Sequence, residues 1–161
     1  MANADRPQGF RPKGPVQEQV RAIAGARVFP GDAVALAATG KVSPATAGVD
    51  IYGVALDYAD ADGDEVLLSV AMDQLYICQA DEAEIDDQTD VGQPVDLLAT
   101  AGDTTYNVSR QELDSSTIGT GGQFIVLGID RRVDNALGDK ADVLCKVNEH
   151  QIFGENDSAG V

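Results

Sequence analysis

The feature that most constrains the fold is a series of short runs in which apolar and polar residues alternate. Alternation places the apolar side chains on one face of a strand, whereas a helix repeats about every 3.6 residues. Many short strands of this kind predict an all-β fold, either a small antiparallel β-sandwich or a β-barrel. The runs lie at residues 34–38, 51–58, 66–72, 75–79, 94–98, 104–110, 123–132 and 142–149.

Turn signals separate these runs. Asp62 and Gly63 stand between two alternating runs, which is a strong hairpin signal because tight hairpin turns need positive φ. No internal repeat is evident, and no Gly/Pro-rich linker divides residues 28–153. We therefore expect one β-rich body over 28–153, followed by a flexible C-terminal tail at 154–161.

The N-terminal region has a different character. Residues 1–15 hold three of the six prolines, and proline removes a backbone donor and favours extended conformations. The sequence therefore predicts an extended basic arm with its lead-in over 1–27, with Phe10 as its one aromatic side chain. Residues 16–24 fit one helical face or a strand, and a strand is favoured because the run is short.

Charge divides the chain at the same point. Residues 1–27 carry five basic and two acidic side chains, or +3, whereas the remainder carries −19, and the whole chain −16. That balance argues against nucleic acid and anionic membranes as partners, since both require Lys and Arg. We expect no secretory signal and no membrane span, because no stretch approaches the roughly 18 apolar residues required.

No catalytic or metal-binding constellation stands out. His150 is the only histidine, and we expect it to make a structural hydrogen bond. Cys78 and Cys145 are expected to be buried free thiols, with a disulfide as the alternative. The serines lack a nucleophile elbow, and the glycine turns lack the phosphate-loop pattern. Two acidic clusters are interpreted as solvated loops, with weak calcium binding left open: Asp57, Asp60, Asp62, Asp64 and Glu65, then Asp81, Glu82, Glu84, Asp86, Asp87 and Asp90. The prediction is a non-enzyme without a cofactor.

Three segments together resemble the decoration, or cement, proteins of tailed-phage capsids. The opening MANADRPQGFRP is similar to the arm of that family, and a middle stretch combines a GD-V-L turn and strand, a GVAL strand and a hairpin. The most specific part is the end, which matches S-x-x-E-L-D-S-S and N-x-x-G followed by V-N-E-H-Q. The matching residues there are Ser109, Glu112, Leu113, Asp114, Ser115, Asn135, Gly138, Val147, Asn148, Glu149, His150 and Gln151.

The resemblance implies a structural virion protein on the outer surface of a capsid assembled in the host cytoplasm. Such a protein binds as a homo-dimer or homo-trimer and cements neighbouring major capsid proteins against the pressure of packaged DNA. An extended arm can add a strand to a sheet edge and anchor itself with an aromatic side chain. The predicted capsid-binding residues of the arm are Arg6, Phe10, Arg11 and Lys13. Removing residues 1–13 is expected to leave a folded body.

Two other functions fit the same composition. Another virion part, such as a tail or spike protein, shares the strand-rich pattern. A small-ligand or carbohydrate-binding β-module would also be all-β, although aromatic side chains make up only 5% of the chain. Binding to a shell, as opposed to binding of a free glycan, separates these alternatives.

Overall fold

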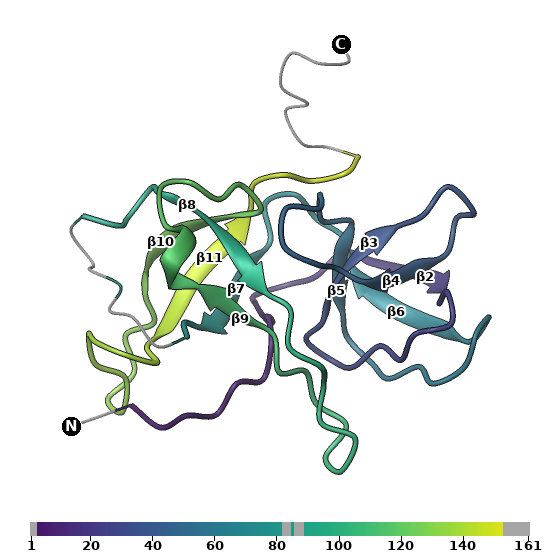
Figure 1. Cartoon of the computed structure of the whole chain (residues 1–161), viewed down its shortest axis with the longest axis horizontal. Coiled ribbons are helices and arrows are strands. Elements are labelled where there is room, and N and C mark those ends of the chain that lie inside the picture. Colours follow the sequence, from purple (N-terminus) through teal and green to yellow (C-terminus); the bar gives the residue numbers. More distant parts are fainter. Residues whose placement is uncertain (1–2, 82–84, 86–88, 153–161) are drawn as a thin grey trace.

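The computed structural model describes residues 3–81, 85 and 89–152, and the chain is almost entirely β there (Figure 1). Two antiparallel sheets lie side by side and pack together as a small β-sandwich, so the all-β antiparallel prediction is confirmed. Among the described residues, no helix is long and apolar enough to cross a bilayer. The predicted tail at 154–161 lies outside the described residues.

The six-stranded sheet contains the strands of the C-terminal half and one N-terminal strand. In spatial order its strands are β1 (Arg11–Lys13), β7 (Leu75–Gln79), β11 (Asp142–Val147), β10 (Phe124–Ile129), β8 (Pro94–Leu98) and β9 (Glu112–Asp114). A short 3-10 helix, η1 (Ser115–Thr117), follows β9.

The five-stranded sheet contains the strands of the N-terminal half. In spatial order its strands are β2 (Glu18–Ala22), β6 (Glu65–Ser69), β5 (Gly53–Ala55), β3 (Ala33–Leu36) and β4 (Val42–Pro44). Strand β2 confirms the strand favoured for 16–24, and the β5–β6 pair confirms the hairpin around Asp62 and Gly63.

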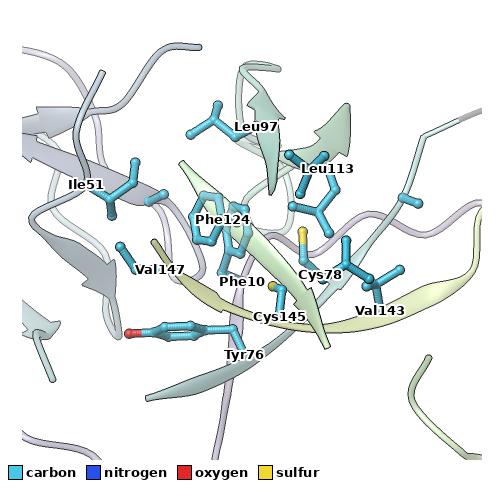
Figure 2. Packing of buried hydrophobic residues seen from close by; sticks show 14 of the residues in the cluster. Phe10, Ile51, Tyr76, Cys78, Leu97, Leu113, Phe124, Val143, Cys145 and Val147 are labelled. Carbon is cyan, nitrogen blue, oxygen red and sulfur yellow. The ribbon is translucent and has the colours of Figure 1, made fainter. Parts of the chain in front are cut away.

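The buried apolar residues form two cores, and the larger one joins the two sheets. The larger core gathers buried residues of the six-stranded sheet with Phe10 and Ile51 (Figure 2), and with Val54 of the other sheet. The smaller core lies within the five-stranded sheet and includes Ile23 and Leu68. Because the larger core draws on both sheets, the two sheets form one packed body.

The two sheets share one connectivity once β1 is set aside. Repeat 1 (β2 to β6) and repeat 2 (β7 to β11) each contain five strands, ordered first, fifth, fourth, second and third across the sheet. In each repeat a parallel bridge links the third strand to the residue that directly follows the first strand. These bridges are Ile23 with Val42, and Ala80 with Leu113. Each repeat is therefore an almost closed ring of five strands.

The strand registers of the two repeats also coincide. The alignment matches 31–39 with 92–100, 42–56 with 113–127, and 65–70 with 142–147. It superposes the opposite residues of every strand pair that these stretches form in both repeats. For example, Leu36 lies opposite Val42 in repeat 1, and the equivalent Leu97 lies opposite Leu113 in repeat 2. In the same way, the pair Val34 and Gly53 corresponds to Val95 and Phe124. The pair Ala55 and Leu68 corresponds to Val126 and Cys145.

Backbone hydrogen bonds outside the strands repeat in the same way. The N–H of Gly31 donates to Ala55 at 2.8 Å, and the N–H of Gly92 donates to Val126 at 2.7 Å. Both glycines have positive φ, 93° and 84°, a conformation that glycine adopts without steric cost. The expectation that the chain has no internal repeat is therefore wrong.

The repeats differ most between their second and third strands. Repeat 1 joins β3 to β4 by a tight turn, whereas repeat 2 joins β8 to β9 by a long hairpin loop that projects from the body (Figure 1). The predicted strand at 104–110 is wrong, because these residues form turns closed by a single bridge between Asp103 and Val108. We call residues 99–110 the projecting loop.

Candidate interaction surface

The N-terminal segment, residues 3–13, lies against the body, so the extended N-terminal arm is not confirmed. The side chain of Asn3 donates to the carbonyls of Ala136 and Asp139, at 2.9 Å in both cases. The Gln79 side chain accepts from the N–H of Arg6 at 3.0 Å and donates to the Ala4 carbonyl at 2.8 Å. Since β1 and β2 both lie within 1–27, a boundary at residue 27 does not separate an arm from the body.

Phe10 belongs to the larger core. Its ring stacks on Phe124, with centroids 4.2 Å apart and planes inclined by 10°, and meets Tyr76 edge-on (Figure 2). The side chain is fully buried. Phe10 therefore anchors the N-terminal segment to its own body, and a deletion of residues 1–13 would remove part of the core.

The segment enters the core through a close backbone crossing. Gly9 has a φ of 66°, and a Cβ atom there would lie 2.3 Å from the Gly31 carbonyl oxygen and 2.5 Å from the Ser109 side chain. The Phe10 N–H donates to the Gly31 carbonyl at 2.8 Å. Only glycine fits at such an approach, which explains the sequence Gln-Gly-Phe before β1.

Arg11 and Lys13 form ion pairs within the protein. Arg11 lies 2.9 Å from Asp142, and Lys13 lies 2.9 Å from Asp130, whose side chain is only 4% exposed. These ion pairs hold β1 along β7. Both cations already have partners, so they are less available to an outside surface than the sequence alone indicates.

Arg6 differs from the other basic residues of the segment. It is exposed, and its guanidinium forms no ion pair with any described residue. It lines a groove of about 720 Å³ between residues 5–8 and the projecting loop. Of the four predicted arm residues, Arg6 is thus the one that lines this groove, whereas Lys13 is exposed but ion-paired.

The projecting loop forms the opposite wall of this groove. Tyr106, near its tip, is 76% exposed. The Asp103 carboxylate shapes the turn by accepting from the N–H groups of Thr105 at 2.8 Å and Tyr106 at 3.2 Å, and it pairs with Arg110 at 2.6 Å. The Thr105 bond is the main reason that the pKa of Asp103 is lowered.

The groove collects opposite charges beside an exposed aromatic ring. Arg6, Arg110 and Lys140 line it together with Asp5, Asp103 and Glu112. Tyrosine and arginine are among the residue types enriched at the energetic centres of protein interfaces. Its chemistry therefore suits a polar protein surface with a pocket for an aromatic side chain. We call this surface the N-terminal groove.

The first acidic cluster does not converge on a metal site. Asp60 pairs with Arg27 and Asp62 pairs with Lys41, while Asp64 accepts from the N–H groups of residues 60 and 61. In the described part of the chain, no three His, Cys, Asp or Glu side chains come together. Of the second cluster, Asp81 accepts from the Ser115 N–H at 3.0 Å, whereas Glu82, Glu84, Asp86 and Asp87 lie outside the described residues.

His150 makes the structural hydrogen bond predicted for it. Its Nε2 donates to the Val70 carbonyl at 3.1 Å, and its Nδ1 accepts from the Ile152 N–H at 3.2 Å. Burial lowers the pKa of His150, which favours this neutral ring. Cys78 and Cys145 are buried and free, so the favoured thiol prediction is also confirmed.

A second cavity, of about 480 Å³, lies where the projecting loop meets repeat 1. Its buried polar side chains are already engaged in the protein. Asp32 accepts from the Phe29 N–H at 2.9 Å, and Gln111 accepts from the Ala33 N–H at 2.7 Å. Burial raises the pKa of Asp32. This cavity is therefore mainly a product of packing around the loop, with few polar groups free for a small ligand.

Sequence reasoning missed Tyr106, Arg110 and Lys140, which the fold brings to Arg6 from distant positions. The only sequence signal was the polar, Gly-containing stretch around 99–110, which is typical of an exposed loop. Comparison with protein-family models, with curated proteins and with solved structures found no match to this chain.

Proposed function

We propose that the protein is a decoration protein that binds the outer surface of a phage capsid and cements neighbouring major capsid proteins. The observation that carries the proposal is the N-terminal groove, where exposed Arg6 and Tyr106 flank mixed charges on an otherwise acidic body. The motif resemblance supplies the identity of the partner, the major capsid protein. The groove supplies a surface suited to it.

The residues that carry the resemblance maintain the shape of the body. Gln151 donates to the Leu36 carbonyl and accepts from the Leu36 N–H, which ties the last residues to repeat 1. Asn135 donates to the carbonyls of Asp130 and Asp142 and closes the loop between β10 and β11. A cement protein needs a rigid body of this kind, because a clamp that deforms transmits little restraint between capsid subunits.

Cementing follows from mass action and multivalency. A protein that binds only the assembled shell stabilises that shell relative to separated subunits. In a dimer or trimer, several grooves bind at once, and each further contact is effectively intramolecular. The acidic remainder of the surface faces solvent in this proposal and repels neighbouring particles.

Co-sedimentation with purified shells tests the proposal. The wild-type protein should pellet with shells, and Arg6→Glu and Tyr106→Ala should each reduce occupancy at least about tenfold, as expected for central interface residues. Arg131→Glu and Leu137→Ala serve as controls, because they reverse a charge and truncate a large side chain at exposed positions outside the groove. Equal occupancy by all variants, or binding to a free glycan without shells, would contradict the proposal.

A further inference from the structure

Strand β1 occupies an edge in repeat 2 that has a counterpart in repeat 1. In repeat 2, Arg11 and Lys13 of β1 lie opposite Ile77 and Leu75 of β7. The strand of repeat 1 equivalent to β7 is β2. Matching the bridge residues Ile23 and Ala80 makes Val20 equivalent to Ile77 and Glu18 equivalent to Leu75.

The backbone groups of Glu18 and Val20 point to this counterpart edge. The Gln17 carbonyl accepts from the Val70 N–H at 3.0 Å, and the Ile23 N–H donates to Asp64 at 2.8 Å. Successive residues of a strand direct their backbone groups to opposite sides, so odd-numbered residues face β6 and Glu18 and Val20 face outward. There β2 is the last strand of the sheet, and its paired strand, β6, lies on the opposite side of Glu18 and Val20.

The charges around the two edges also correspond. In repeat 2, Arg11 of β1 pairs with Asp142, which lies opposite Gln79. The residue equivalent to Asp142 is Glu65, which lies opposite Ala22. Glu65 is exposed and pairs with no cation among the described residues. Repeat 1 thus keeps the carboxylate that holds β1 in repeat 2, without the strand.

We infer that the outer edge of β2 at Glu18 and Val20 is a docking site for an extended basic segment of a partner protein. The segment adds antiparallel to β2, as β1 does to β7, and places an Arg or Lys beside Glu65. Main-chain hydrogen bonds supply affinity, and the cation selects the segment. This site lies on a different element from the N-terminal groove and stands whether or not the partner is a capsid.

A second copy of the chain fits this edge less well. Two β2 strands related by a two-fold axis through Val20 place Glu18 of the second copy opposite Ala22, on the same face as Glu65. That arrangement adds a carboxylate where repeat 2 has a cation. Strand β4 also occupies the edge beyond Ala22, since the Ala24 N–H donates to Val42 at 2.8 Å.

The probe for this site is a synthetic peptide with the sequence of residues 4–15, and the readout is amide hydrogen exchange by NMR. We expect millimolar peptide to slow exchange at Glu18 and Val20 at least about tenfold, as new backbone hydrogen bonds form. The same peptide with Glu at its Arg11 and Lys13 positions should give no protection. Unchanged exchange at both amides with the basic peptide would overturn the inference.

Substitutions in the protein test whether the peptide binds at the outer edge of β2 without disturbing the fold. Val20→Pro removes the outward N–H and leaves the β6 ladder intact, so it should abolish protection of Glu18, whereas Val20→Thr should preserve it. Glu65→Lys should also abolish peptide binding, with Asp73→Lys as the exposed control. If protection of the Glu18 and Val20 amides rises with protein concentration in the absence of peptide, the edge binds a second copy of the chain. That result would overturn the inference of a basic partner segment. No shell is used, so failure here is distinct from failure in co-sedimentation.

Discussion

Phe10 stacks on Phe124 at a centroid distance of 4.2 Å, which joins the N-terminal segment to the strand at the centre of repeat 2 (Figure 2). The pair lies in the larger core beside Tyr76 and Val147. The basic N-terminal segment is consequently a structural part of the body, and the surface that it offers to a partner is set by what remains outward, chiefly Arg6.

Truncation of Phe10 should destabilise the whole protein. Phe10→Ala leaves a cavity in a closely packed core, and such changes cost about 3–5 kcal/mol of unfolding free energy. Phe10→Leu keeps most of the volume and should cost clearly less. Urea unfolding measures both variants, and a loss below about 1 kcal/mol for Phe10→Ala would show that the segment is not part of the cooperative core.

The crossing at Gly9 should be intolerant of any side chain. In Gly9→Ala the new methyl group would meet the Gly31 carbonyl and Ser109, in addition to the strain of positive φ. Gly14→Ala is the matched control, because Gly14 also has positive φ but has no atom within 4 Å of a built Cβ. Thermal unfolding should show a larger loss for Gly9→Ala, and equal losses would contradict the close crossing.

The strands that alternation marks clearly were predictable because the signal is local. Strands β10 and β11 alternate buried and half-buried positions throughout, and β6 alternates buried and less buried positions from Glu65 to Leu68. Strands β1, β4 and β9 have only three residues each, and two of them contain proline. A run of three residues is too short to show alternation, so a local pattern predicts an arm or a turn there.

Local sequence patterns also failed to predict the repeat and the groove. The matched stretches 31–39 and 92–100 share a Gly, a Val, a Leu, an Ala and a Thr, but the projecting loop interrupts the alignment after that point. The groove brings Arg6 and Lys140 to Tyr106 and Arg110 of the projecting loop, and these three parts of the chain are adjacent only in the fold. The charge pattern marks a basic N-terminal region. That Arg11 and Lys13 form ion pairs within the protein could be seen only from the fold.

The two thiols should report on unfolding. Cys78 and Cys145 are both fully buried, and burial raises the pKa of each well above its usual value. The reactive thiolate is therefore scarce and inaccessible in the native protein. At pH 8, a thiol reagent followed by mass spectrometry should leave the native protein unlabelled and modify both cysteines in urea. Rapid stoichiometric labelling of native protein would contradict the buried placement.

His150 should make stability depend on pH in a defined direction. Burial lowers its pKa below the ordinary value of 6.5, so the folded state prefers the neutral ring. The corresponding stability is present above pH 6.5 and is lost as pH falls toward the folded-state pKa. The difference in unfolding free energy between wild type and His150→Gln should therefore shrink between pH 7.5 and pH 5, by up to about 1.4 kcal/mol per pH unit. A constant difference would contradict a buried neutral His150.

A cryo-EM reconstruction of capsids incubated with the protein would show whether and how the protein binds the outer surface of the shell. The proposed function predicts density for the two-sheet body on the outer surface, with the projecting loop and Arg6 toward the major capsid protein and the acidic remainder toward solvent. Shells without added density at saturating protein, or a body attached with the N-terminal groove open to solvent, would contradict the account.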